Sequence, residues 1–330
     1  MKSIVFVTEA SSDTGFGHLL ESINLAKELS KYSNVIFLIN KNRYSTKLLE
    51  NFSYIVYEDI KELSNIVKKC IEWKVIIINL KLVSLELMNE IEDNNKKIIV
   101  IDELGNKPIV SDILINPSVK KKWKNYSFPS KKPINYFGPK YTLLNKDFSL
   151  LHRNKRSPSE VILITMGGAD KTCSTAKIMN ALKNTDYIKK VVVGPGFRNR
   201  RELEIINKKS KHKFELIDGL KNISNLILEA SVIFTAGGDT LYEAACIGTP
   251  AIVLWEDTHE KKQADWFTSE GSAINLGQGT VVEGKKIEEI TIRLQNNVDK
   301  WIKMSNSGKR IIDGKGVERI VKIIRSSIPN

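Results

Sequence analysis

The chain has 330 residues, a formal net charge of +13, 42% hydrophobic residues and 27% charged residues. This composition is ordinary for a globular protein of about two domains. No apolar run approaches the ~18 residues that span a bilayer, and the opening KSIVFVTEASS resembles a first strand rather than a signal peptide. We therefore expect a cytoplasmic protein without a transmembrane segment.

The basic residues are spread over the whole chain and accompany only 8% aromatic residues. This pattern predicts a solvated lysine-rich surface and no nucleic-acid partner, while peripheral contact with an anionic membrane stays open. The three cysteines and four histidines show no metal-ligand spacing, so we expect no metal and no cofactor. The oligomeric state does not follow from the sequence.

Short β-branched runs alternate with amphipathic helical stretches, which is typical of an α/β protein with parallel sheets. In the first half, the predicted strands are Ile4–Val7, Val35–Ile39, Val75–Asn79, Ile98–Ile101 and Ile113–Ile115. A proline- and lysine-rich segment from Lys120 to Arg156 then breaks the rhythm. In the second half, the predicted strands are Val161–Thr165, Val191–Val193, Phe214–Ile217, Val232–Thr235 and Ala251–Trp255.

These patterns predict two Rossmann-like domains. We assign residues 1–140 to an N-terminal domain, 141–158 to a linker and 159–330 to a C-terminal domain, whose last ~45 residues look helical apart from glycine-rich turns near Gly308 and Gly314. Ligands of open α/β sheets bind outside the carboxyl ends of the strands, so the loops that follow the strands are the candidate sites.

The first candidate site follows the first strand and contains Gly15, Gly17 and His18. Glycines let a backbone approach a ligand closely, and a helix N-terminus favours an anion. The dinucleotide pattern G-x-G-x-x-G fails because Leu20 holds its third glycine position, so a nicotinamide site is disfavoured. A histidine in such a turn is suited to general-base chemistry near neutral pH, and we take His18 as the catalytic candidate.

The second candidate site is Gly237-Gly238-Asp239-Thr240, with Glu243 one helical turn further on. The backbone N–H groups and the Thr240 hydroxyl are suited to a diphosphate, and a carboxylate at Glu243 can accept both hydroxyls of a ribose. A plain N-cap followed by a first-turn acid is the alternative interpretation.

Two further loops have both a binding and a structural interpretation. The loop with Gly167 and Gly168 either lines the site or serves a helix that is capped by Asp170. The loop with His259 and Glu260 either touches a sugar or is solvated.

Four segments, in this order, resemble the UDP-sugar hydrolases of the pseudaminic acid pathway and the related spore-coat polysaccharide biosynthesis proteins. They are TGFGHLLESINLAKEL, YFGPKYTLLNKDF, LITMGGADKTCSTAKIMNAL and FTAGGDTLYEAACIGTPAIVL. The last segment is shared more widely, with inverting glycosyltransferases of the two-Rossmann-domain (GT-B) fold.

The resemblance implies a GT-B fold with an interdomain cleft and a metal-independent UDP-sugar hydrolase. Its C-terminal domain would hold UDP, with the ribose at Glu243, the diphosphate at Gly237–Thr240 and the uracil at Gly219 and Leu220. His18 would activate a water molecule that attacks C1 with inversion. UDP and a free amino-deoxy sugar would leave, in nonulosonic acid or surface polysaccharide biosynthesis.

Three departures from the family pattern fall in the sugar half of the site. Glu21 replaces an arginine that commonly follows the histidine, Asn79-Leu80-Lys81 replaces an Asp-His/Asn-Tyr segment, and His259-Glu260 replaces Asn-Gln. An inverting glycosyltransferase, in which His18 would deprotonate an acceptor hydroxyl, is therefore the alternative function. A catalytically silent sugar-nucleotide-binding protein is a third hypothesis.

Overall fold

The computed structural model describes residues 3–10, 16–41, 43–70, 72–81, 84–92, 96–103, 105, 109–119, 126–129, 132–219 and 222–327. The chain divides into two compact units. The first unit is Met1–Lys146 together with Gly314–Asn330, and the second unit is Asp147–Asp313. No helix within the described residues combines the length and hydropathy needed to cross a bilayer.

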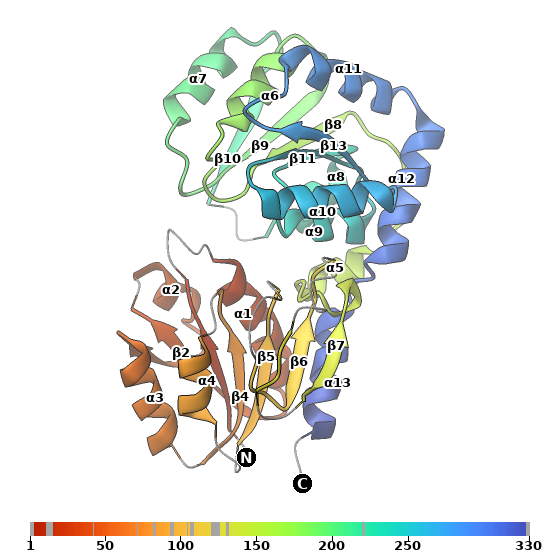
Figure 1. Cartoon of the computed structure of the whole chain (residues 1–330). Coiled ribbons are helices and arrows are strands. Elements are labelled where there is room, and N and C mark those ends of the chain that lie inside the picture. Colours follow the sequence, from red (N-terminus) through yellow and green to blue (C-terminus); the bar gives the residue numbers. More distant parts are fainter. Residues whose placement is uncertain are drawn as a thin grey trace. The chain divides into compact units, whose positions relative to one another are not determined.

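The first unit contains a seven-stranded sheet in which every pair of neighbours is parallel (Figure 1). The strand order is β3-β2-β1-β4-β5-β6-β7. The strands are β1 (Ser3–Thr8), β2 (Asn34–Asn40), β3 (Ser53–Tyr57), β4 (Trp73–Asn79), β5 (Lys97–Ile101), β6 (Ile113–Asn116) and β7 (Ile134–Phe137). The helical elements are α1 (Gly17–Leu29), α2 (Arg43–Leu48), α3 (Ile60–Lys69), α4 (Leu85–Ile91), η2 (Pro139–Tyr141) and α13 (Gly316–Ser327).

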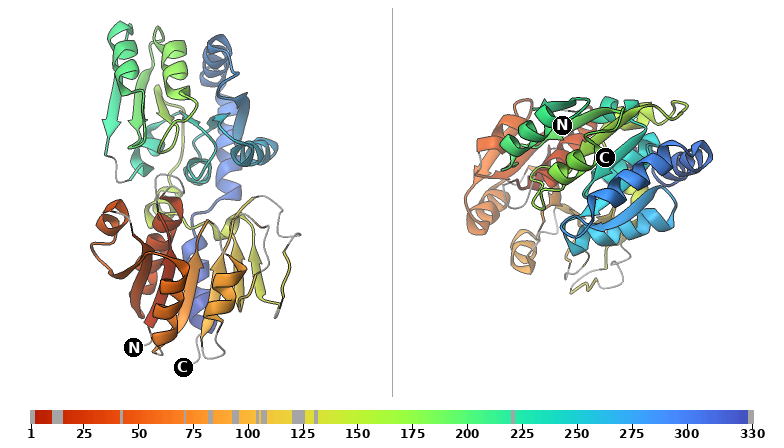
Figure 2. Two further views of the ribbon diagram at one scale, coloured as in Figure 1. Left: turned by 60° about the vertical axis from the view of Figure 1, so that its left-hand side comes forward. Right: turned by 90° about the horizontal axis from the view of Figure 1, so that it is seen from above.

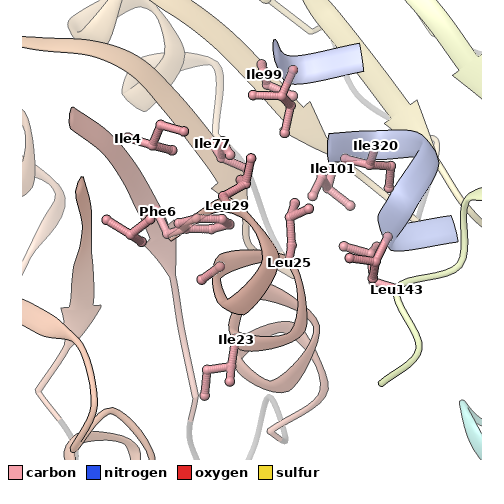
Figure 3. Close-up of a cluster of buried hydrophobic side chains, with 14 of the residues drawn as sticks. Ile4, Phe6, Ile23, Leu25, Leu29, Ile77, Ile99, Ile101, Leu143 and Ile320 are labelled. Carbon is pink, nitrogen blue, oxygen red and sulfur yellow. The ribbon is translucent and has the colours of Figure 1, made fainter. Parts of the chain in front are cut away.

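Two hydrophobic clusters cover the two faces of this sheet because alternate residues of each buried strand point to opposite sides. One cluster joins Phe6 and Ile77 to α1 and α13, and Figure 3 shows its side chains meeting on that face. The other joins Val7 and Ile78 to α3 and α4. Figures 1 and 2 show these helix pairs on opposite faces of the sheet.

The second unit contains a six-stranded sheet of the same all-parallel kind, in the order β10-β9-β8-β11-β12-β13. Its strands are β8 (Val161–Thr165), β9 (Ile188–Val193), β10 (Phe214–Asp218), β11 (Val232–Thr235), β12 (Ala251–Trp255) and β13 (Ala273–Gln278). Its helices are α5 (Lys146–Leu151), which begins at the boundary between the units, α6 (Ser174–Leu182), α7 (Arg200–Lys209), α8 (Ser224–Glu229), α9 (Thr240–Ile247), α10 (Thr258–Ser269), α11 (Gly284–Gln295) and α12 (Val298–Ile311).

The C-terminal helix α13 lies outside the domain in which it was predicted. The C-terminal domain was expected to span residues 159–330, but α13 belongs to the first unit. Its apolar stripe, Val317, Ile320, Val321 and Ile324, is buried in the same cluster as α1. Burying each of these side chains contributes about 2 kcal/mol. The i, i+3, i+4, i+7 spacing was visible in the sequence, but only the tertiary structure shows which core it fills.

Two expectations about loops were also wrong. The predicted break from Lys120 to Arg156 contains β7, an edge strand of the first sheet. The predicted turn near Gly308 lies inside α12, where a Cβ would come within 2.9 Å of the Ala245 carbonyl oxygen. Gly308 therefore permits close packing of α12 against α9.

Candidate functional site

The candidate histidine lies at the topological switch point of the first sheet. From β1 the chain winds outward through β2 and β3 on one side and through β4 to β7 on the other, so the carboxyl ends of β1 and β4 flank the point where the winding reverses. His18 is the second residue of α1, the helix that follows β1, and Asn79 is the last residue of β4. Ligands of doubly wound sheets bind at this place.

Asn79 links the two sides of this switch point. Its Oδ1 lies 3.1 Å from His18 Nδ1, and its Nδ2 donates to the His18 carbonyl oxygen at 3.1 Å and to Glu21 Oε2 at 3.1 Å. The Ser22 hydroxyl donates to the same His18 carbonyl oxygen at 2.7 Å. Asn79 is 1% exposed and the His18 side chain 17% exposed, so a buried amide supports a partly accessible imidazole.

Asn40 has a structural role beside this site. Its Oδ1 accepts from the Ala10 N–H at 3.0 Å and its Nδ2 donates to the Ala10 carbonyl oxygen at 3.3 Å. Asn40 thus holds the backbone that follows β1 in place. Gly15 lies outside the described residues, and Gly17 is the first residue of α1.

The switch point of the second sheet lies between β8 and β11, and glycine loops follow both strands. A Cβ at Gly167, Gly168 or Gly238 would meet no protein atom within 4 Å, so the backbone at these positions is open to a ligand. Gly167 and Gly237 have φ values of +73° and +112°, which only glycine adopts without strain. The loop after β9 supports the loop after β8, since the Gly196 N–H donates to the Gly168 carbonyl oxygen at 2.8 Å.

Asp170 is a helix cap. Its two carboxylate oxygens accept from the Ser174 and Thr175 N–H groups at 2.8 and 3.0 Å, and the residue is 4% exposed. Burial raises the pKa of this carboxyl. Asp170 thus has the expected structural role at the start of α6, although Cys173 and not Asp170 holds the N-cap position, and Gly167 and Gly168 remain candidates for binding.

Helix α9 begins differently, because Asp239 occupies the N-cap position without a side-chain capping bond. Thr240 and Glu243 lie one turn apart on this helix and both are half-buried. Burial, with a smaller contribution from the Asp239 carboxylate, raises the pKa of Glu243 to about 8. The helix thus presents a threonine hydroxyl, its first N–H groups and a carboxyl that holds its proton near neutral pH.

A second perturbed carboxyl follows β12. Asp257 caps α10 by accepting from the His259 and Glu260 N–H groups, both at 2.8 Å. Glu260 accepts from the Glu256 N–H at 2.7 Å, and burial raises its pKa to about 7. A Cβ at Gly237 would come within 3.2 Å of the Glu260 carbonyl oxygen, so the loops after β11 and β12 are in contact.

The remaining candidates follow β10. Gly219 has a φ of +62°, and the preceding Asp218 pairs with Arg200 of α7. Leu220 lies outside the described residues. The second unit therefore brings Gly167, Gly168, Gly219, Gly237, Gly238, Thr240, Glu243, His259 and Glu260 to the carboxyl edge of one sheet.

Sequence reasoning noted Asn79 and Glu21 only as departures from a pattern and missed that both contact His18 or its amide partner. It also missed Glu256, whose Oε1 accepts from the Thr172 N–H at 3.3 Å between the loops after β12 and β8. A usable signal existed for Asn79, because a polar residue that ends an otherwise apolar strand next to β1 is expected at a switch point.

The two doubly wound sheets define an α/β protein of the GT-B fold, and the solved structures agree. The MurG structure from Acinetobacter baumannii has a TM-score of 0.71 at 14% identity, over 99% of this chain and 100% of that one. Residues 161–320 match the glycosyltransferase family 28 C-terminal domain.

Three proteins with related sequences are similar to this chain over most of its length. The spore coat polysaccharide biosynthesis protein SpsG of Bacillus subtilis is 24% identical over 95% of both chains. The UDP-2,4-diacetamido-2,4,6-trideoxy-beta-L-altropyranose hydrolase of Campylobacter jejuni is 26% identical over 81% of this chain and 97% of its own. The uncharacterized protein MJ1062 of Methanocaldococcus jannaschii is 28% identical over 83% of this chain, which spans 60% of the length of that protein. The chain is therefore similar, over most of its length, to SpsG and to the UDP-sugar hydrolase, and it has the GT-B fold.

Proposed function

We propose that this protein is a metal-independent UDP-sugar hydrolase that breaks the anomeric C1–O bond with inversion and releases UDP and a free amino-deoxy sugar. The place of this reaction would be nonulosonic acid or surface polysaccharide biosynthesis. The observation that carries the proposal is His18, held by Asn79 at the switch point of the first sheet. The similarity to a hydrolase over 97% of its length supports it.

In the proposed reaction, His18 takes a proton from a water molecule whose oxygen forms a bond to C1. The C1–O bond to the β-phosphate breaks, its electron pair stays on the phosphate oxygen, and UDP leaves. The histidine then gives its proton to solvent, so one water molecule is consumed in each turnover. General-base assistance of this kind contributes about 10²–10⁴-fold to the rate.

The second unit would bind the nucleotide. The first N–H groups of α9 and the Thr240 hydroxyl suit the diphosphate, and Glu243 suits the ribose hydroxyls. Gly167 and Gly168 would let a phosphate approach the backbone, and Gly219 with Leu220 would contact the uracil. His259 and Glu260 would contact the sugar.

The test is an NMR time course with UDP-2,4-diacetamido-2,4,6-trideoxy-altrose and related UDP-amino sugars, without an acceptor. The expected result is free sugar and UDP at equal rates, with an inverted anomeric configuration in the first-formed product. UDP-sugars that bind, as judged by line broadening, but stay intact throughout the panel would contradict the hydrolase proposal.

The second candidate is an inverting glycosyltransferase, which the family 28 match over residues 161–320 favours. In that case His18 would deprotonate an acceptor hydroxyl instead of water. Turnover that begins only after an acceptor glycan is added would support this candidate over the hydrolase.

A further inference from the structure

We infer that Asn79 and Glu21 are positioning residues that hold the His18 imidazole with its proton on Nδ1, so that Nε2 is the nitrogen that accepts a proton. This inference rests on the proposed function, because it assigns partners to the proposed general base. Neither residue is predicted by the family pattern, which has other residue types at both positions.

The hydrogen bonds of Asn79 allow one amide orientation. Its Nδ2 faces three oxygens: the His18 carbonyl oxygen and Glu21 Oε2, each at 3.1 Å, and Ser22 Oγ at 3.3 Å. A flipped amide would place Oδ1 against a carbonyl oxygen and a carboxylate, neither of which can donate. The Ser22 proton is already given to the His18 carbonyl oxygen. Oδ1 must therefore face His18 Nδ1.

This orientation fixes the tautomer of the imidazole. An amide oxygen only accepts, so the 3.1 Å contact between Asn79 Oδ1 and His18 Nδ1 is a hydrogen bond only when Nδ1 carries the proton. In the neutral ring, the lone pair then lies on Nε2. The bond also sets the angle of the ring about its axis, since Asn79 is buried at the end of β4 and cannot follow a rotating partner.

Glu21 supplies the negative charge that the amide lacks. Its Oε2 lies 3.8 Å from His18 Nδ1, one helical turn away on α1, and the same oxygen accepts from Asn79 Nδ2. The Glu21 side chain is 11% exposed, so solvent screens this charge weakly. When Nε2 takes up a proton, the ring becomes cationic beside this carboxylate, which favours the protonated product of the base step.

The arrangement divides between two residues a task that one carboxylate performs in a Ser-His-Asp triad. There, a carboxylate both orients the histidine and stabilises its positive charge. Here, the Asn79 amide orients the ring, and the Glu21 carboxylate stabilises its positive charge from the Nδ1 side. The arginine common at the Glu21 position in the family could not do this, because a cation would oppose protonation of the ring.

The primary test reads the tautomer directly and needs no substrate. Nitrogen-15 NMR of imidazole-labelled protein, at about pH 9 where an ordinary imidazole is neutral, distinguishes the protonated ring nitrogen from the bare one. The His18 signals are identified by their loss in His18→Gln. The expected result is a proton on Nδ1 of His18, and a proton predominantly on Nε2 would overturn the inference.

Variants separate orientation from charge. Asn79→Leu should give a mixture of tautomers and lower kcat by about 100-fold, within the range of general-base effects, at an unchanged KM. Glu21→Gln should keep the tautomer while kcat falls by about 10-fold. An unchanged tautomer and kcat in Asn79→Leu would refute the role of Asn79, and an unchanged kcat in Glu21→Gln would refute that of Glu21.

Matched controls exist in the same unit. Asn116 is a fully buried asparagine at the last position of β6, bonded to the Tyr126 hydroxyl, and Glu28 lies on α1 in an ion pair with Lys31. Asn116→Leu and Glu28→Gln should change neither the His18 tautomer nor kcat. If the wild-type tautomer is as inferred but no UDP-sugar is hydrolysed, the proposed function fails while the assignment of the imidazole partners stands.

Discussion

The two units use the same doubly wound topology, but their switch points differ in chemistry. In the first unit the switch point is filled by polar side chains, with a histidine, an asparagine, a glutamate and a serine joined by hydrogen bonds. In the second unit it is lined by glycines, three of which have room for a Cβ that the protein does not fill. The first switch point thus presents side chains, whereas the second presents mainly backbone, with the Thr240 hydroxyl and the Glu243 carboxyl beside it.

This difference suits the two units to different tasks. Proton transfer needs a titratable side chain held at a fixed angle, which a strand end and a helix start can provide together. Recognition of a phosphate needs several N–H groups at close range, which side chains would obstruct. The difference therefore supports the proposal that the first unit carries the chemistry and the second binds the nucleotide, and substitutions in each unit test it.

The largest expected effect is in the first unit. His18→Gln removes the proposed base and should lower kcat by about 10³-fold, while the Kd for UDP stays unchanged because the nucleotide would be bound by the second unit. Enzyme kinetics and calorimetry measure the two quantities. The control is His212→Gln, which alters an exposed histidine beside Asp186. Full turnover in His18→Gln would contradict the proposal that the first unit carries out the chemistry.

The next effect concerns stability in the second unit. Asp170→Ala leaves two buried N–H groups of α6 without acceptors and places alanine at a φ of +44°, so unfolding should become easier by about 2 kcal/mol. Urea denaturation measures this change, and Asp170→Asn should restore only part of it, because its amide oxygen replaces one of the two acceptors. A loss of UDP affinity with unchanged stability would instead identify Asp170 as a ligand contact.

A single added methyl group tests whether the backbone of the second unit recognises UDP. Gly238→Ala adds a Cβ that meets no protein atom within 4 Å, so the fold should be unaffected while the Kd for UDP rises about 10-fold, or 1.4 kcal/mol. Gly194→Ala is the contrast, because its Cβ would lie 2.5 Å from the Gly168 carbonyl oxygen and should lower the Tm. Wild-type UDP affinity in Gly238→Ala would contradict recognition through this backbone.

A further effect is a dependence of stability on pH. Because the pKa of Glu243 is raised from 4.5 to about 8, the folded protein retains a proton that the unfolded chain releases. The free energy of unfolding should therefore fall as the pH rises from about 4.5 to about 8, and level off above it.

Glu243→Gln removes this contribution. Between pH 4.5 and pH 9, the Tm of the variant should fall less than the Tm of the wild type. Calorimetric scans at a series of pH values measure this difference. The exposed Glu283 gives the control variant Glu283→Gln, which should follow the wild type. Parallel pH profiles for Glu243→Gln and the wild type would mean that Glu243 ionises as an ordinary carboxyl.

Much of the architecture could be predicted from local pattern. The central strands of both sheets are continuous apolar runs because both of their faces are covered, and this signal is present in the sequence itself. The sequence pattern did not predict β3, β7 and β13, which are three of the four edge strands, whereas the fourth edge strand, β10, was predicted. Edge strands are partly exposed, so their pattern is weaker: Tyr54 and Ile55 of β3 are 43% and 39% exposed.

The sequence alone determined two Rossmann-like halves, the glycine loops of the second and the histidine at the start of α1, because each depends on residues adjacent in the chain. The tertiary structure decided which unit receives α13 and which side chains surround His18. Asn79 lies 61 residues from His18, and only the parallel pairing of β1 with β4 brings them to 3.1 Å. Long-range strand order, which no local propensity specifies, therefore converted an isolated histidine into an oriented one.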